Sequence, residues 1–123
     1  MRVAVIAGVL GLVAVLGTAG QAAAQSVSRG TGAVLRVLDK VTGETREHEL
    51  ANGGTVAIGR LMLGLSECRY PEGDPGRDAF ALLQVRNETT EVIFSGWMIA
   101  SSPALNTLDH RRYDVWVIRC NTA

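Results

Sequence analysis

The residue types that could perform chemistry gather in one stretch near the C-terminal end of the chain. Serine, histidine and aspartate are the nucleophile, base and orienting acid of many hydrolases. The nucleophile turn G-x-S-x-G does not occur in the sequence, and helix capping and a hydrogen-bonded corner account for the same residues. We therefore expect no catalytic residue and keep a small hydrolase that uses Ser102 and His110 as the alternative. The residues in question are Ser101, Ser102, Asp109, His110 and Asp114.

Metal binding has few candidate ligands in this chain. His48 and His110 are the two histidines, and His48 stands between Glu47 and Glu49 in a stretch that alternates like a strand. Neighbouring residues of a strand point to opposite faces, so these three side chains do not converge. The sequence predicts neither a metal site nor a cofactor.

The same C-terminal stretch could instead form a binding surface. Tryptophan, tyrosine and arginine are enriched at the energetic centres of protein interfaces. Arg111 and Arg112 suit contact with an acidic partner or a lipid headgroup, although such pairs are commonly solvated or paired with a nearby carboxylate. Trp97 suits either core packing or the wall of a groove. The candidate binding surface consists of Trp97, Met98, Ser101, Ser102, His110, Arg111, Arg112 and Tyr113.

Short strands separated by turn residues must position these side chains. Alternating apolar residues recur with turn signals every eight to twelve positions, which is typical of a sandwich or small barrel. The fold class is therefore all-β: a small antiparallel sandwich or barrel of about seven strands with one short helix, stapled by a disulfide. The expected strands cover residues 33–38, 45–50, 55–59, 61–68, 79–86, 91–100 and 114–120.

Local signals refine that picture. Asn52-Gly53 predicts a hairpin turn, because both residues tolerate positive φ. Ser102-Pro103 predicts the start of a short helix over residues 104–108. Alternation places Trp116 and Cys120 on one face of the last strand, where Trp116 would pack on the disulfide.

The beginning of the chain predicts export. Arg2 precedes an apolar run over residues 3–17, and Ala22-Ala23-Ala24 supplies a small-residue cleavage site. Residues 1–24 are the expected signal peptide, 25–32 a flexible segment and 33–121 a single β domain. An uncleaved membrane anchor is the competing interpretation, because residues 3–24 are just long enough to span a bilayer. Cleavage after Ala24 would leave a periplasmic protein with no transmembrane helix. A lipid anchor is not expected, because no cysteine lies near the cleavage site.

Charge and cysteine content agree with an exported chain. The sequence holds 12 basic and 12 acidic side chains, without the basic excess that nucleic-acid binding requires. Its two cysteines, Cys68 and Cys120, are expected to pair in an oxidising compartment. A disulfide between Cys68 and Cys120 would close a long loop of the chain, and such a bridge contributes about 4 kcal/mol to the free energy of unfolding in the chain-entropy model.

Four strings of the sequence resemble the bacterial domain-of-unknown-function family 2155. They are L-R-V-L-D-K-V-T-G at residues 35–43, G-R-L at residues 59–61, and F-S-G-W-M-I-A-S-S-P-A-L-N-T-L-D-H with Y-D-V-W-V-I-R-C between residues 94 and 120. The resemblance implies a small exported envelope protein of alphaproteobacterial type, with the two cysteines as part of the pattern. It also suggests an accessory place in an inner-membrane respiratory complex, and it implies no established activity.

Together these features favour a non-enzymatic module that binds a protein or stabilises an assembly in the cell envelope. Its expected partner is an envelope or membrane-complex protein, and nucleic acid is not expected. The alternatives are the small periplasmic hydrolase already named and a small-ligand carrier with an apolar cavity in a barrel.

Overall fold

The computed structural model describes Gly8, Gly11 and residues 26–123 of the chain. The expected signal peptide, apart from those two glycines, lies outside the described residues. Within the described part of the chain, no helix is long and apolar enough to cross a membrane.

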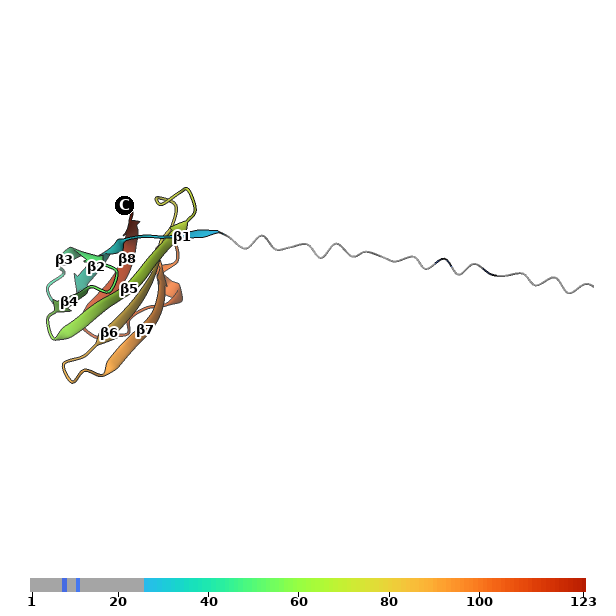
Figure 1. The fold of residues 1–123 in the computed structure, drawn as a ribbon. Helices are drawn as coiled ribbons and strands as arrows, with labels where there is room; N and C mark the ends of the chain where they lie inside the picture. The colour runs from blue at the N-terminus through green and yellow to red at the C-terminus, as the bar shows by residue number, and fades with distance from the viewer. Residues whose placement is uncertain (1–7, 9–10, 12–25) are drawn as a thin grey trace, which may run out of the picture.

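Residues 26–123 form eight strands and one short 3₁₀ helix, and this fold is all-β as the sequence predicts (Figure 1). Apolar residues alternate along most strands and so leave one buried face on each. The strands are β1 (Val27–Arg29), β2 (Gly32–Asp39), β3 (Thr45–Ala51), β4 (Thr55–Ile58), β5 (Leu61–Pro71), β6 (Phe80–Arg86), β7 (Val92–Ile99) and β8 (Tyr113–Asn121), and the 3₁₀ helix η1 is Pro103–Leu105.

The strands form two antiparallel sheets that face each other as a sandwich. Sheet A has the order β1-β5-β6-β7, with β4 also paired to β5, and sheet B has the order β3-β2-β8. In Figure 1, β5, β6 and β7 lie in front of β2 and β8. Twenty buried residues pack into one core between the sheets, including Leu35 of sheet B and Leu63 and Leu83 of sheet A, each at most 1% exposed. This arrangement does not favour a carrier with a central cavity.

The segment before residue 33, which was expected to be flexible, contains a short paired strand that its small residues did not predict. Val27–Arg29 of this segment form β1, which pairs with the C-terminal end of β5. Gly30 and Gly32 are buried, and a Cβ on either would collide with the backbone of Asn121 or Leu50. The glycines therefore permit close packing of backbones here, which composition alone does not separate from flexibility.

The Asn52-Gly53 turn is present, but it does not close a hairpin. β3 belongs to sheet B and β4 to sheet A, so the turn carries the chain from one sheet to the other. Gly53 has a φ of 80° and donates its N–H to the carbonyl of Leu65. Positive φ suits a corner as well as a hairpin, and the local signal therefore did not reveal the strand partner.

The predicted helix is shorter than expected. It consists of the single 3₁₀ turn η1, which starts at Pro103, and Ser102 makes no side-chain capping hydrogen bond.

The disulfide between Cys68 and Cys120 joins the two sheets, since Cys68 lies on β5 and Cys120 on β8, with 5.6 Å between their Cα atoms. The prediction that Trp116 packs on this bridge is wrong. A bulge at Ile118 shifts the pairing of β8 with β2 and reverses the alternation. Val117 and Cys120 consequently face the core, whereas the half-buried Trp116 lies on the outer face of sheet B.

Candidate functional site

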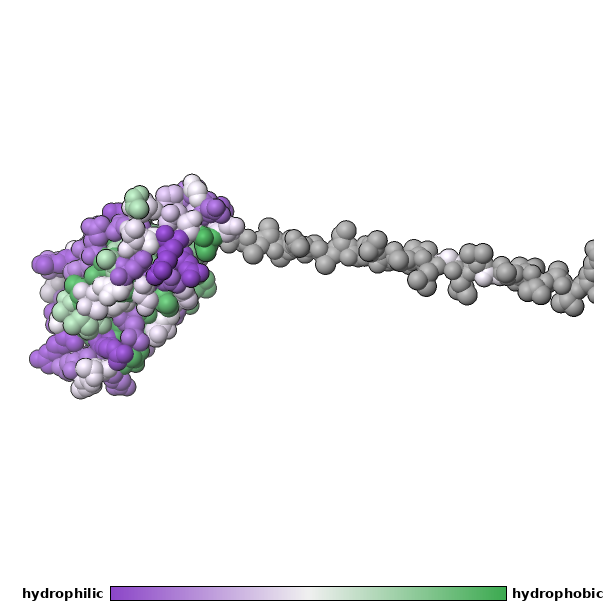
Figure 2. Space-filling model, viewed as in Figure 1, coloured by the Kyte–Doolittle hydropathy of each residue, from purple (hydrophilic) through white to green (hydrophobic). Residues whose placement is uncertain are grey.

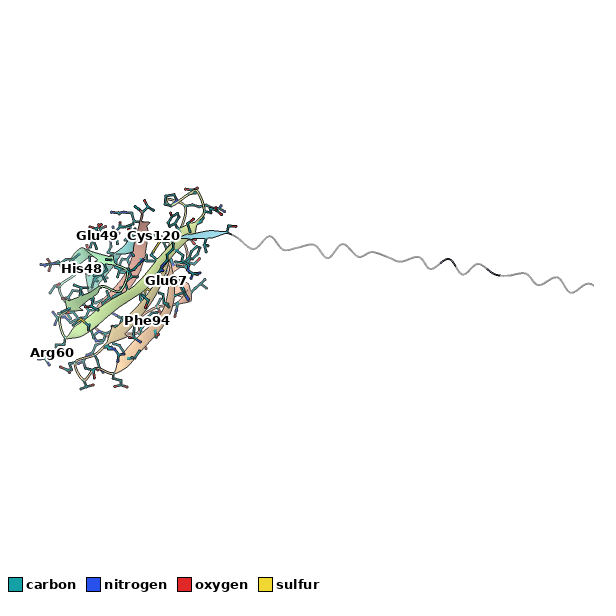
Figure 3. All side chains as sticks on the ribbon, viewed as in Figure 1. His48, Glu49, Arg60, Glu67, Phe94 and Cys120 are labelled. Carbon is teal, nitrogen blue, oxygen red and sulfur yellow. A yellow bond between two sulfur atoms is a disulfide. The ribbon has the colours of Figure 1, made fainter. Side chains whose placement is uncertain are left out.

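The structure divides the predicted binding surface into two separate regions. Trp97 on β7 is paired with Leu82 on β6, and Leu82 is in turn paired with Glu67 on β5. Trp97 therefore lies at the same height along the sheet as Glu67. Tyr113 lies near the turn between β4 and β5, some six residues away along β5, which is about 20 Å at the rise of a strand. Figure 3 shows Arg60, from that turn, at one end of the sandwich and Cys120 towards the other. One ligand of ordinary size does not contact both regions.

The first region, here called the Tyr113 end, consists of Gly59, Arg60, His110, Arg111, Arg112 and Tyr113. A stack of side chains organises it: the rings of His110 and Tyr113 lie 5.6 Å apart, and the guanidinium of Arg112 lies 5.3 Å from the Tyr113 ring. Tyr113 is 8% exposed, so its ring is held in place by packing and supports the side chains that stack on it. The loop before β8 is thereby held against the sandwich.

An ion pair fixes the position of Arg112. Its Nε and Nη2 donate to the carboxylate of Asp39, at the end of β2, with an Nη2–Oδ2 distance of 3.0 Å. Asp39 also accepts the backbone N–H groups of Val41 and Thr42. The Arg112 hydrogen bond holds the pKa of Asp39 below its usual value, and the same contact raises the pKa of Arg112. Both groups therefore stay charged at neutral pH.

Two surface hollows flank the Tyr113 ring. The larger, of about 510 Å³, is lined by Arg60, Arg111 and Arg112 together with one acidic residue, Glu88. Arg60 is paired with Glu88 at 3.0 Å, whereas Arg111 makes no hydrogen bond or ion pair through its side chain with any residue that the structure describes. The larger hollow thus presents a net positive charge to solvent.

The two candidate serines, Ser101 and Ser102, are not arranged with His110 as in a hydrolase. The Ser101 hydroxyl donates to Asp78, and no hydrogen bond joins either serine to His110 among residues 26–123. Nδ1 of His110 accepts the backbone N–H groups of Arg112 and Tyr113, which leaves the proton of the neutral ring on Nε2. A catalytic histidine needs the opposite tautomer, because Nε2 must accept the proton of the serine. The geometry therefore assigns His110 a role in shaping the loop.

Glu47 and Glu49 point to the opposite side of β3 from His48, as strand alternation predicts. His48 is paired with the buried Leu35 and lies on the inner side of β3, while its two neighbours point outward. In the described part of the chain, no group of three histidine, cysteine or acidic residues could hold a metal ion.

The second region, here called the Trp97 face, lies on the outer side of sheet A. Its hollow of about 380 Å³ is lined by Val27, Arg69, Phe80, Trp97 and Ile99. Trp97 is 36% exposed, and the Arg69 guanidinium lies 5.7 Å from the centre of its ring. Met98 belongs instead to the core and is 2% exposed, so its place in the predicted surface is wrong: strand alternation turns it inward.

Sequence reasoning missed several residues that shape these regions. Asp39 from the end of β2, and Gly59 and Arg60 from the turn between β4 and β5, reach the Tyr113 end from positions far away in the sequence. Asp78 binds the hydroxyl and backbone N–H of Ser101. The strings at residues 35–43 and 59–61 were a usable signal, because the structure brings part of each to the Tyr113 end.

Comparison with known proteins agrees with those strings. The family model "Uncharacterized protein conserved in bacteria (DUF2155)" matches residues 33–120. The chain belongs to the DUF2155 family. A relative from Rickettsia prowazekii (strain Madrid E), named "Uncharacterized protein RP359", is 26% identical over 94 residues. The match covers 73% of this chain and 61% of that protein, so the chain spans less than two thirds of the relative's length. No solved structure matches the chain significantly.

DUF2155 membership covers almost the whole sandwich. The matched region runs from the start of β2 to Cys120 and includes the disulfide, the Tyr113 end and Trp97. β1 precedes it, together with the expected signal peptide.

Proposed function

We propose that this DUF2155 protein is an exported, non-enzymatic module of the cell envelope that binds another protein through its Tyr113 end. Support for export comes from the apolar run after Arg2 and the A-x-A site. The pairing of both cysteines fits an oxidising compartment such as the periplasm. An assembly of the inner membrane, for which the resemblance suggests a respiratory complex, is the proposed setting.

The observation that carries this proposal is the rigid, positively charged hollow beside Tyr113. Arg112 is held by Asp39 and stacked on Tyr113, so its geometry is set before any partner arrives. A preorganised surface loses less conformational entropy on binding than a mobile one. Arg111 adds a guanidinium that has no acceptor in the described structure.

The chemistry of the hollow selects an acidic partner segment. Arginine presents five N–H donors in a planar fork that matches a carboxylate. With the neutral ring of His110 donating only from Nε2, the side chains that line the hollow are richer in donors than in acceptors. Aspartate or glutamate side chains of another protein provide the complementary charge.

Crosslinking tests the proposal. The full tagged chain is expressed in its host, crosslinked gently in intact cells and purified from membranes. Arg111→Glu is expected to abolish a specific crosslinked product, because it reverses the charge of the arginine of this hollow that has no partner among the described residues, without touching the core. Arg77→Glu is the matched control, since Arg77 is also exposed but lies in the loop after β5 at the opposite end.

The two variants together show whether a partner binds at the Tyr113 end. Loss of the product with Arg111→Glu and retention with Arg77→Glu supports a partner at the Tyr113 end. Equal recovery from both variants, or free monomer alone from the unmodified chain, contradicts it.

A further inference from the structure

The Trp97 face has a composition that the Tyr113 end does not share. Its apolar members come from three strands: Val27 on β1, Phe80 on β6, and Trp97 and Ile99 on β7. Val27 is 42% exposed and Trp97 is 36% exposed, so part of each apolar side chain faces solvent. Figure 2 shows this outer side of sheet A, where hydrophobic residues in green lie beside charged residues in purple near the start of β1.

The charge on this face is positive. Arg29 and Arg69 occupy opposed positions on β1 and β5, and both bind the same carboxylate, Glu67, at 3.2 and 3.0 Å. One carboxylate neutralises one of the two guanidinium groups, which leaves an excess positive charge. Both arginines remain substantially exposed, with side-chain exposures of 65% and 46%.

The place of this face along the chain is the second observation. Val27 lies three residues after Ala24, the last residue of the proposed signal peptide. Until that segment is removed, it holds the following residues at the membrane, so the domain cannot leave the bilayer by more than a short length of chain. The Trp97 face therefore begins where the chain meets the membrane during export.

We propose that the Trp97 face rests on an anionic phospholipid surface. Tryptophan prefers the level of the lipid headgroups, where the indole ring is buried and its N–H stays hydrated. Arginine side chains lay their apolar stems along such a surface and keep the guanidinium among the phosphates. The domain would then present its Tyr113 end away from the contact, free for a protein partner.

This inference rests on the proposed export, because the face must meet a membrane in the cell. It does not rest on the proposed protein partner. Binding to lipid vesicles is measured without any other protein, so a failure to bind vesicles says nothing about the crosslinked partner. A failure to find a crosslinked partner likewise says nothing about vesicle binding.

The two tryptophans make the orientation measurable. Trp97 lies on the outer face of sheet A and Trp116 on the outer face of sheet B, and the chain holds no other tryptophan. Trp116→Phe leaves Trp97 as the single fluorophore, and Trp97→Phe leaves Trp116. Each variant, in the form recovered from the envelope, is mixed with vesicles of phosphatidylcholine and phosphatidylglycerol whose acyl chains carry bromine, which quenches tryptophan on contact.

The expected result is a loss of Trp97 emission with anionic vesicles and unchanged emission from Trp116. Vesicles of phosphatidylcholine alone should quench Trp97 less. Equal quenching of both tryptophans, or quenching of neither, overturns the proposal.

Charge variants provide the second measurement. Each arginine near an anionic surface strengthens binding about fivefold, so Arg29→Gln combined with Arg69→Gln should weaken vesicle binding about 25-fold. Arg46→Gln, an exposed arginine on β3 of sheet B, is the matched control and should bind as the unmodified chain does. Vesicle binding by the double variant equal to that of the unmodified chain overturns the proposal. Absence of vesicle binding by the unmodified chain, together with loss of a crosslinked protein from Trp97→Ala in cells, assigns the face to a protein instead. Melting curves verify that each variant is folded.

Discussion

At the scale of single residues, the Tyr113 ring organises one end of the molecule. It is buried between the turn that holds Gly59 and the loop that holds His110. Gly59 has a φ of 57°, and a Cβ there would collide with the Tyr113 hydroxyl. The glycine is therefore required for two reasons, backbone conformation and space.

A pair of alanine substitutions separates those two reasons. Gly43→Ala carries a similar strain, since Gly43 has a φ of 74°, but its Cβ would meet nothing within 4 Å. We expect Gly43→Ala to cost about 1 kcal/mol, and Gly59→Ala about 1–3 kcal/mol more because of the collision. Urea unfolding measures both. Equal costs would mean that Tyr113 does not lie where the structure places it.

At the scale of elements, strand periodicity predicted most of the fold. Residues 33–38, 45–50, 79–86 and 114–120 were all expected as strands, and β2, β3, β6 and β8 cover them apart from Ala79, which is buried one residue before β6. The charged strand β3 lies at the edge of sheet B, as its polar composition predicts.

The wrong prediction for Trp116 and the missed role of Asp39 have one physical cause. Contacts between elements that are distant in the sequence decide which residues pair. The bulge at Ile118 depends on β2, so alternation along β8 alone placed Trp116 on the wrong face. The Tyr113 end depends on Asp39, whose role follows from its contact with a residue 73 positions away. Local signals contain neither piece of information.

Asp78 fastens the crossover from sheet A to sheet B, and it predicts a pH dependence. Burial raises its pKa, but hydrogen bonds from the Ser101 hydroxyl and from the N–H groups of Ala79 and Ser101 outweigh burial and leave the pKa lowered. Its contribution to stability is therefore complete above about pH 4 and is lost as the pH falls through the lowered value.

Asp78→Asn should destabilise the fold by about 1–2 kcal/mol at pH 7, because hydrogen bonds to a charged acceptor are lost. The gap in melting temperature between the two proteins should narrow as the pH falls from 4 to 2, since the unmodified Asp78 also becomes neutral. Melting curves over that range provide the measurement, and a constant gap would contradict the assigned role.

At the scale of the whole molecule, the Tyr113 end and the Trp97 face have different proposed roles. The Cys68–Cys120 bridge joins the sheets close to the Trp97 face, since Arg69 follows Cys68 directly. The Tyr113 end lies at the far side of the sandwich, with its arginines facing solvent. A domain that rests on a membrane by one region and binds a protein by another needs this separation.

Export into an oxidising compartment is the claim on which both proposals depend. The intact mass of the chain recovered from the envelope fraction tests it most directly, because the mass reports both the first residue and the state of the cysteines. The account predicts a chain that begins at Gln25 with Cys68 and Cys120 joined. A chain found in the cytosol that begins at Met1 and carries two free thiols would contradict it.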